Sequence, residues 1–243
     1  MEINIGKVDV LAIGAHPDDI ELGVSGTLLK LRADGKRIGL CDLTMGELGT
    51  RGSGKLRLEE AEKARQIIDA DFRVNLKMDD GFFELSKENK LRIIEVIRAC
   101  QPDVVLCNAL HDRHPDHSRG AELQKTACFL SGLRRIETTY NGQAQEEWRP
   151  KIVLHYIQDH FMKPSIIIDV TDHWDKRMES ILAYSSQFYN PNNTEPETAI
   201  SSREFLQNQE GRGLQLGRYI GVKFGEGLVS ERPIGINSLT DIL

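Results

Sequence analysis

Apolar and polar residues follow one another along this chain in blocks that predict strands alternating with helices. Short apolar runs rich in β-branched residues are typical of buried strands, and longer amphipathic segments indicate helices. The predicted strands cover residues 8–13, 37–43, 74–76, 104–107, 152–158 and 165–170. The predicted helices cover residues 26–33, 57–69, 87–100, 121–133, 172–185 and 198–219.

This alternation predicts an α/β fold. Four strand-helix units in sequence favour a Rossmann-like, mostly parallel sheet with helices on both faces. A chain of 243 residues with 40% hydrophobic and 28% charged content can form one such domain. No repeat or low-complexity tract divides the sequence, so we expect a single domain over residues 1–243. The polar segment 136–150 is expected to be a connection or a subunit contact.

Composition and charge exclude several classes of protein. The net charge of −6 and the pI near 5.7 argue against a nucleic-acid-binding surface. No apolar stretch approaches the ~20 residues of a membrane span, and the amino terminus does not resemble a signal peptide. We therefore expect a cytoplasmic protein that binds no nucleic acid and no membrane. Four cysteines without CxxC spacing predict reduced core residues, and these are Cys41, Cys100, Cys107 and Cys128.

A polar cluster follows the first predicted strand. His16, Asp18, Asp19 and Glu21 come directly after its apolar run, and Pro17 can start a helix there. The cluster is therefore expected at a strand-to-helix turn, where open α/β sheets bind their ligands. An aspartate that merely caps a helix would look similar, so this cluster alone does not define a functional site.

A second cluster, HDRHPDH at residues 111–117, follows the strand predicted at 104–107. His16 with Asp19, and His114 with His117, are spaced i, i+3, so each pair can project to one side of a first helical turn. Two strand ends therefore present imidazole and carboxylate groups together. Three nitrogen or oxygen ligands with an open fourth position are typical of a catalytic zinc site. The two clusters together predict one metal centre.

A glycine-rich loop, TMGELGTRGSGK at residues 44–55, follows the second predicted strand. It lacks the GxxxxGK[ST] spacing of a phosphate-binding loop, so we expect a mobile loop instead. A nucleotide-binding oxidoreductase is one alternative to a hydrolase, but the first turn has GAHPDD where that class has GxGxxG. A metal-binding regulatory protein without turnover is the other alternative.

Taken together, the motifs resemble the zinc-dependent, LmbE-like N-acetylglucosaminyl deacetylase family. The resemblance rests on HPDD at 16–19, TMGE at 44–47, Arg57 with Glu60 and Ala64, HPDH at 114–117, IDVT at 168–171 and YSSQF at 184–188. DRHPDH and KPSIIIDVT make the chain most similar to the bacillithiol-biosynthesis branch, which deacetylates N-acetylglucosaminyl malate. A tyrosine that family members bring to the site has no clear counterpart, and Tyr189 and Tyr219 are the candidates.

The resemblance implies roles for the residues of both clusters. The implied zinc ligands are His16, Asp19 and His117. This donor set also suits Fe²⁺. Asp18 is implied as the general base, because a bound metal lowers the pKa of water until a neighbouring carboxylate can take its proton. His114, oriented by Asp116, would as an imidazolium stabilise the oxyanion of the tetrahedral intermediate.

Three further residues are expected to bind the substrate. The family uses Arg57, Arg113 directly precedes His114, and Glu47 lies in the glycine-rich loop. Guanidinium groups at one sheet edge suit a substrate with carboxylates, such as a malate conjugate. The expected partners are therefore a small N-acetyl sugar substrate and further copies of the chain in a homo-oligomer. The remaining histidines, His111, His155, His160 and His173, are interpreted as surface or strand residues.

Overall fold

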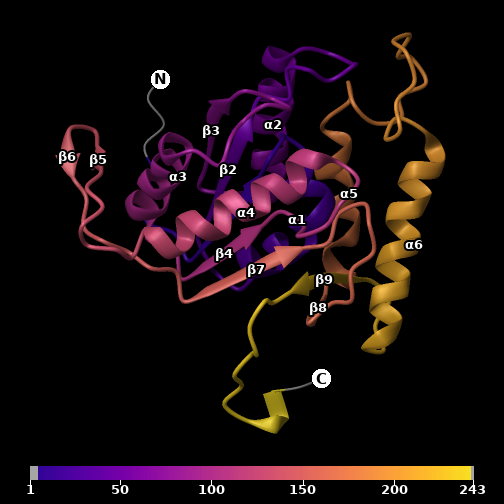
Figure 1. Ribbon diagram of the computed structural model, residues 1–243. Helices are drawn as coiled ribbons and strands as arrows, with labels where there is room; N and C mark the ends of the chain where they lie inside the picture. The colour runs from indigo at the N-terminus through magenta and orange to yellow at the C-terminus, as the bar shows by residue number, and fades with distance from the viewer. Residues whose placement is uncertain (1–4, 242–243) are drawn as a thin grey trace.

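The computed structural model describes residues 5–241 and has the predicted α/β architecture (Figure 1). A seven-stranded sheet has the order β3-β2-β1-β4-β7-β9-β8. Its strands are β1 (Val10–Gly14), β2 (Ile38–Thr44), β3 (Phe72–Met78), β4 (Val104–Cys107), β7 (Ile152–Tyr156), β8 (Ile166–Asp169) and β9 (Gly225–Val229). The first five pair in parallel, whereas β9 pairs antiparallel with both β7 and β8. The expected mostly parallel sheet is confirmed.

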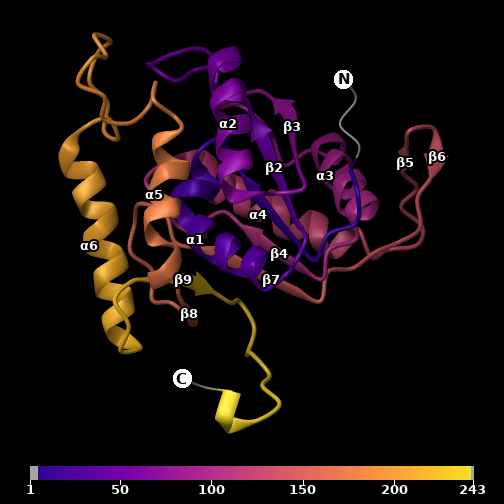
Figure 2. The same ribbon diagram turned by 180° about the vertical axis from the view of Figure 1, so that it is seen from behind.

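Helices cover both faces of this sheet. They are α1 (Asp19–Ala33), α2 (Gly54–Ile68), α3 (Lys87–Cys100), α4 (Pro115–Leu130), α5 (Trp174–Leu182) and α6 (Arg203–Tyr219), with short 3₁₀ turns η1 (Thr171–His173) and η2 (Leu239–Asp241). Helices α3 and α4 lie on one face, and α1 lies on the other with α2 and α5 beside it (Figure 2). Helix α6 packs against β9 at one end of the sheet. No helix within residues 5–241 is long and apolar enough to cross a bilayer.

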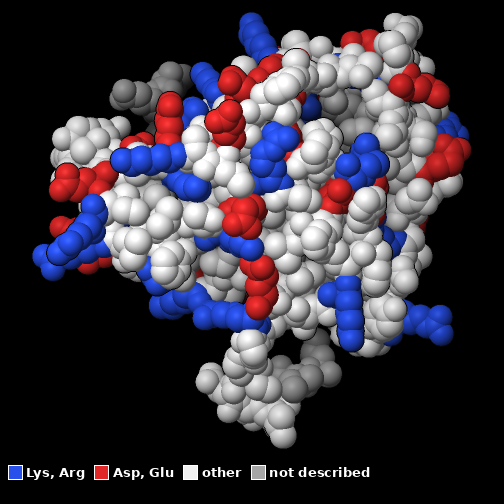
Figure 3. All heavy atoms as spheres, in the orientation of Figure 1, with Lys and Arg blue, Asp and Glu red and all other residues white. Residues whose placement is uncertain are grey.

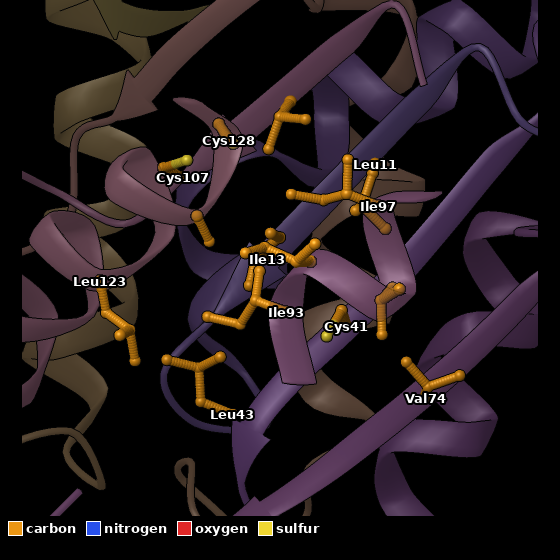
Figure 4. Close-up of a cluster of buried hydrophobic side chains, with 14 of the residues drawn as sticks. Leu11, Ile13, Cys41, Leu43, Val74, Ile93, Ile97, Cys107, Leu123 and Cys128 are labelled. Atoms are coloured by element: carbon orange, nitrogen blue, oxygen red, sulfur yellow. The ribbon is translucent and has the colours of Figure 1, made fainter. Parts of the chain in front are cut away.

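Side chains of β1 alternate between two cores. Leu11 and Ile13 pack with Ile93 and Ile97 of α3 on one face of the sheet (Figure 4). Val10 and Ala12 pack against α1 on the other face. A strand buried on both faces is apolar at every position, which is why β1 was visible as a continuous run. Each fully buried Leu or Ile contributes roughly 1.5 to 3 kcal/mol to folding. The four cysteines are free and buried in the structure, as expected.

Two helices begin earlier than the ranges 26–33 and 121–133, and they include the first helical turns that Pro17 and the i, i+3 pairs indicate. Helix α1 begins at Asp19 instead of residue 26, and α4 begins at Pro115 instead of residue 121. Both starts lie within the polar motifs; Ile20, Val24 and Leu28 give α1 apolar residues at helical spacing, whereas the first turn of α4 has none. Pro115 occupies the first turn of α4, and His114 is its N-cap. The two histidine clusters therefore lie at the first turns of two helices.

Three short strands were not predicted. Within the segment expected to be a connection, β5 (Thr139–Tyr140) and β6 (Gln143–Ala144) form a hairpin. The third is β9, whose two glycines lower its strand propensity. The glycines are needed for close packing, because a Cβ at Gly225 would lie 2.7 Å from Ile167 Cγ2. Tertiary contact with β8 and α6 therefore decides this strand.

Candidate active site

The two histidine clusters meet at the carboxyl ends of β1 and β4, which are neighbours in the sheet. The strand order reverses between these two strands, and such switch points are the usual ligand sites of open α/β sheets. The ring of His16 lies 4.7 Å from that of His114 and 5.5 Å from that of His117, between centroids. About a hundred residues of sequence therefore separate side chains that share one site.

The Asp19 carboxylate is the most heavily hydrogen-bonded group of the site. Its Oδ1 atom lies 2.9 Å from His117 Nε2 and accepts a 2.9 Å hydrogen bond from Gln158. Its Oδ2 atom accepts hydrogen bonds from the Asn108 side chain and the His16 backbone amide, at 2.9 and 3.0 Å. Burial alone would raise the pKa of Asp19, but His117 and His16 hold that pKa well below its usual range. Asp19 is therefore a carboxylate.

The His16 ring lies among three carboxyl groups. Its Nε2 atom is 3.0 Å from Asp80 Oδ1 and 3.2 Å from Asp116 Oδ2, and its Nδ1 atom is 3.7 Å from Asp19 Oδ2. Burial opposes the charged ring, but these carboxylates outweigh burial and raise the pKa of His16 to about 9. Sequence reasoning missed Asp80, although it belongs to an acidic pair just after the third strand.

His117 is likewise backed by a carboxylate that was not singled out. Its Nδ1 atom forms a short contact with Asp112 Oδ2, while Nε2 faces Asp19. Burial would lower the pKa of His117, but Asp19 and Asp112 raise it to about 10. A histidine that binds a metal through one ring nitrogen usually donates a hydrogen bond from the other nitrogen to a carboxylate. The carboxylate orients the ring and fixes its tautomer. The signal in the sequence was Asp112, the first of two acidic residues inside HDRHPDH.

Asp116 does not orient His114 in the expected way. Its backbone N–H donates to His114 Nδ1 at 3.2 Å, whereas its carboxylate faces His16 and accepts from the Gly81 amide at 2.8 Å. Burial and the positive charges of His16 and His117 lower the pKa of His114. This direction opposes the imidazolium that we expected. A neutral ring that accepts at Nδ1 instead carries its proton on Nε2.

Asp18 is buried, with 4% of its surface exposed, and it lies beside the metal-ligand candidates. Its backbone has φ 105°, a left-handed conformation that is strained by about 1 to 3 kcal/mol in a residue other than glycine. Its side chain makes no capping hydrogen bond and instead accepts one from Arg57 Nη2 at 2.8 Å. Burial raises the pKa of Asp18 to about 7, although Arg57 opposes this shift. A carboxyl group with such a pKa can exchange protons near neutral pH.

The three residues expected to bind substrate lie in different environments. Arg57 is buried and donates to Asp18 and to the carbonyl groups of Pro17 and Gly46, so it lies behind the site. Glu47 accepts hydrogen bonds from the amides of Met45 and Asp80 at 3.2 and 2.9 Å. It therefore joins two loops.

Arg113 is exposed and lies beside the histidine clusters, whereas Glu47 is also exposed but accepts from two backbone amides. Its side chain is 49% exposed, forms a 2.9 Å ion pair with Asp159, and lines a small cavity beside His117. Residues of α6, namely Phe205, Gln209 and Arg212, line the same cavity. The predicted arginine at the rim of the site is therefore present, and α6 supplies the opposite wall.

The glycine-rich loop is tied to its surroundings at several points, unlike the mobile loop that we expected. Arg51 donates to the carbonyl groups of Pro196 and Glu195 at 2.7 and 3.2 Å. The carboxylate of Glu195 accepts from the Gly52 amide at 3.0 Å. Ser53 caps α2 by accepting from the Leu56 amide. The loop and the 190–196 segment therefore hold each other beside the site.

The remaining histidines and the two candidate tyrosines lie away from the site formed by His16, His114 and His117. His111 is exposed, and His155 is buried on β7 with Nδ1 2.8 Å from the Asn108 carbonyl oxygen. The guanidinium of Arg203 lies 4.6 Å from the Tyr189 ring, and Tyr219 is exposed at the end of α6. Among the hydrogen bonds of residues 5–241, neither tyrosine bonds to a residue of the two histidine motifs.

The donor set fits a divalent metal ion. Within residues 5–241, two groups of three residues each place one possible ligand atom per residue within 4.8 Å of the others. The first group is His16, His114 and His117, and the second is His16, Asp80 and Asp116. The set expected from the sequence shares two residues with the first group, and its third, Asp19, contacts both of them. Imidazole nitrogen and carboxylate oxygen suit Zn²⁺ and Fe²⁺. The residues of each of the two groups lie close enough together to hold one such ion.

Known proteins are similar to this chain. The sequence model of the family described as GlcNAc-PI de-N-acetylase, PIG-L, matches residues 11–128, a range that contains both histidine clusters. Diacetylchitobiose deacetylase of Thermococcus kodakarensis is 27% identical over 190 residues, which are 74% of this chain and 70% of that protein. The uncharacterized deacetylase YaiS of Escherichia coli is 33% identical over 125 residues, or 49% of this chain and 67% of YaiS.

A relative with a different reaction spans more of the chain. The 4-oxalmesaconate hydratase of Pseudomonas putida is 24% identical over 255 residues, covering 95% of this chain and 92% of the hydratase. Among solved structures, the conserved protein TT1542 of Thermus thermophilus superposes with a TM-score of 0.85 at 31% identity. That match covers 96% of this chain and 98% of TT1542. The whole described fold therefore has a close structural counterpart.

Proposed function

Because the chain belongs to the PIG-L/LmbE-like deacetylase family, we propose that it hydrolyses the acetamide of an N-acetylglucosaminyl conjugate with the help of Zn²⁺. The chain is an amide hydrolase, and its named deacetylase relative acts on an N-acetyl sugar. The observation that carries the proposal is Asp18, a buried carboxyl group with a pKa raised to about 7 beside a set of metal ligands. A closed structural metal site binds no water or substrate, so it needs no neighbouring group that exchanges protons.

The residues that would hold Zn²⁺ are His16, Asp19 and His117. Carboxylates behind both imidazoles support this assignment, because Asp80 and Asp116 face His16 and Asp112 faces His117. When bound, the ion supplies Lewis acidity, which lowers the pKa of water and polarises the acetyl carbonyl. Fe²⁺ fits the same donors.

Asp18 is assigned as the proton carrier of the reaction. In its ionised form it takes a proton from the attacking water as the new carbon–oxygen bond forms, and it then delivers that proton to the sugar nitrogen as the carbon–nitrogen bond breaks. Acetate and a free amine result, and one water is consumed. Arg57 holds the carboxylate in place at 2.8 Å. Arg57 is therefore a positioning residue in this mechanism.

His114 is assigned to the oxyanion of the tetrahedral intermediate. Its Nδ1 atom accepts from the Asp116 amide, which leaves the Nε2 proton available for donation. A neutral imidazole can donate this hydrogen bond without becoming an imidazolium. The lowered pKa of His114 is compatible with that form.

The substrate that we propose is N-acetylglucosaminyl malate. Arg113 supports an acidic aglycone, because its half-exposed guanidinium lines the cavity beside His117 and can bind a carboxylate through two parallel hydrogen bonds. Another N-acetyl sugar conjugate would use the same metal chemistry. Hydration of 4-oxalmesaconate is a second candidate, because the hydratase relative spans 95% of the chain.

Acetate release tests the proposal. The zinc-loaded protein is incubated with N-acetylglucosaminyl malate, free N-acetylglucosamine, diacetylchitobiose and, separately, 4-oxalmesaconate. We expect acetate and free amine from the malate conjugate, lost when a chelator removes the metal and restored by Zn²⁺. Consumption of 4-oxalmesaconate without acetate release from any N-acetyl sugar would replace the proposal with the hydratase reaction.

A further inference from the structure

A second cavity lies apart from the histidine clusters, on the α4 face of the sheet near the start of β7. Its volume is about 310 Å³, which is within the range of small-molecule sites. Three parts of the chain form its walls, namely the second half of α4, residues 149–155, and the segment just after β9. Phe129, Pro150 and Val153 supply apolar surface. The cavity is large enough for a small metabolite.

The lining is basic although the protein is acidic overall. Lys125, Arg149, Lys151 and Arg232 face one acidic residue, Glu231, in a chain with net charge −6. Figure 3 shows Lys and Arg side chains gathered on this face below α4, along the start of β7. A local excess of positive charge on an acidic protein favours a negatively charged ligand.

The two arginines are held in place without acidic partners. Arg149 donates to the Phe129 carbonyl at 2.9 Å, and its guanidinium lies 4.3 Å from the centre of the Phe129 ring. Arg232 donates to the carbonyl of Lys151. Neither arginine forms an ion pair within the part of the chain that the structure describes, whereas Lys125 and Lys151 pair with Glu231 and Asp103. Two oriented guanidinium groups are therefore available to an anion.

The floor of the cavity contains a buried histidine. His155 is only 1% exposed, and its Nδ1 atom donates to the Asn108 carbonyl at 2.8 Å. In the neutral ring, Nε2 then presents a lone pair, and Glu231 Oε2 lies 3.7 Å from it. Both atoms are acceptors, so neither satisfies the other, and each can accept a hydrogen bond from a separate donor. Two hydroxyl groups of a ligand would supply these donors.

We propose that this cavity is a second ligand site, specific for a small anion that also carries hydroxyl groups. The anionic group would lie between Arg149 and Arg232, and two hydroxyl groups would donate, one to His155 Nε2 and one to Glu231. The carbon skeleton would lie against Phe129 and Val153. Hydroxycarboxylates and polyol phosphates share this chemistry, and the experiment separates the two. The proposal does not depend on the deacetylase reaction.

Calorimetric titration of the intact, zinc-loaded protein tests this site. The probes are glycerol 3-phosphate, glycerate, inorganic phosphate and glycerol. We expect one of the two hydroxylated anions to bind at millimolar concentration or below, inorganic phosphate to bind more weakly, and glycerol not to bind. Arg149→Gln and Arg232→Gln should each weaken the preferred probe by about tenfold or more, because each removes a hydrogen bond to a charged group. His155→Asn should weaken the hydroxylated anion but not phosphate.

Two controls separate this site from the catalytic one. Arg113→Gln removes an arginine of the cavity beside His117, and Lys87→Gln removes an exposed lysine at the start of α3. Both variants should bind the preferred probe as the unchanged protein does, and Arg149→Gln should retain acetate release. The proposal is overturned if no probe binds, or if Arg113→Gln abolishes binding while Arg149→Gln does not. It is also overturned if Arg232→Gln dissociates an oligomer in sedimentation, because the cavity would then be a subunit contact.

Discussion

Arg57 Nη2 lies 2.8 Å from Asp18 Oδ2, and both side chains are buried. A residue expected to bind the substrate therefore holds the expected general base. We predict that Arg57→Met lowers kcat/KM about 10- to 100-fold, equally for N-acetylglucosaminyl malate and free N-acetylglucosamine, since a hydrogen bond to a charged group contributes roughly 1.5 to 3 kcal/mol. Arg57 lowers the pKa of Asp18, so removing Arg57 should raise that pKa. The rise in rate on the acidic side of the pH–rate profile, where Asp18 ionises, should therefore move to higher pH. A loss confined to the malate conjugate would contradict this assignment.

Arg113 should determine the preference for an acidic aglycone. Its guanidinium is half exposed beside His117, so Arg113→Gln removes a carboxylate ligand without disturbing Asp18. We expect kcat/KM for the malate conjugate to fall about 10- to 100-fold while free N-acetylglucosamine is little affected. Steady-state kinetics with the two substrates decide this. Equal losses for both would show that Arg113 does not contact the aglycone.

Replacing Asp18 should impair proton transfer without metal loss, whereas replacing His117 should remove the metal. Asp18→Asn keeps the size of the side chain but removes the base, so turnover should fall about 10²-fold or more while metal content stays near one ion per chain. His117→Ala serves as the comparison and should lose the metal. Elemental analysis beside acetate release measures both. If Asp18→Asn lost its zinc, Asp18 would be a metal ligand, and the assigned roles of Asp18 as base and Asp19 as ligand would be wrong.

Asp112 should control metal affinity through His117. Its carboxylate contacts His117 Nδ1, so Asp112→Asn should weaken zinc binding about 10- to 100-fold without removing a ligand. Competition with a chromophoric chelator measures the affinity. Asp103→Asn is the matched control, because Asp103 is a half-exposed aspartate away from the site whose ion-pair partner is Lys151. Equal affinities of the two variants would limit Asp112 to a structural role.

Metal uptake should release protons. In the metal-free protein the pKa values of His16 and His117 are raised to about 9 and about 10, so both rings are charged at neutral pH. Each must lose its proton to bind a metal, so about two protons should leave per ion bound. Affinity should therefore rise with pH until about 9 to 10, well above the value for an isolated histidine. Calorimetry in buffers with different ionisation enthalpies measures the release. A heat of binding that is independent of the buffer would contradict the prediction.

The sequence by itself determined the central strands and the location of the site. Residues 10–14 and 104–107 are buried on both faces of the sheet, so every position is apolar and the strands were visible without any partner. Helix α3 was predicted with the bounds that it has, because its periodicity and its ends are local features. Polar residues just after parallel strands must gather at one sheet edge, which placed HPDD and HPDH together.

Only the tertiary structure decided how the charged groups of that edge pair. Asp80 faces His16, Arg57 holds Asp18, and the carboxylate of Asp116 faces His16 in place of His114. These contacts join loops that follow different strands, and loops carry no periodic pattern from which a direction can be predicted. A buried charge takes whichever partner the strand order and the loop conformations bring within about 3 Å. The sequence therefore determined which two motifs meet at this edge, whereas packing decided which charged groups, Asp80 and Asp112 among them, face the histidines.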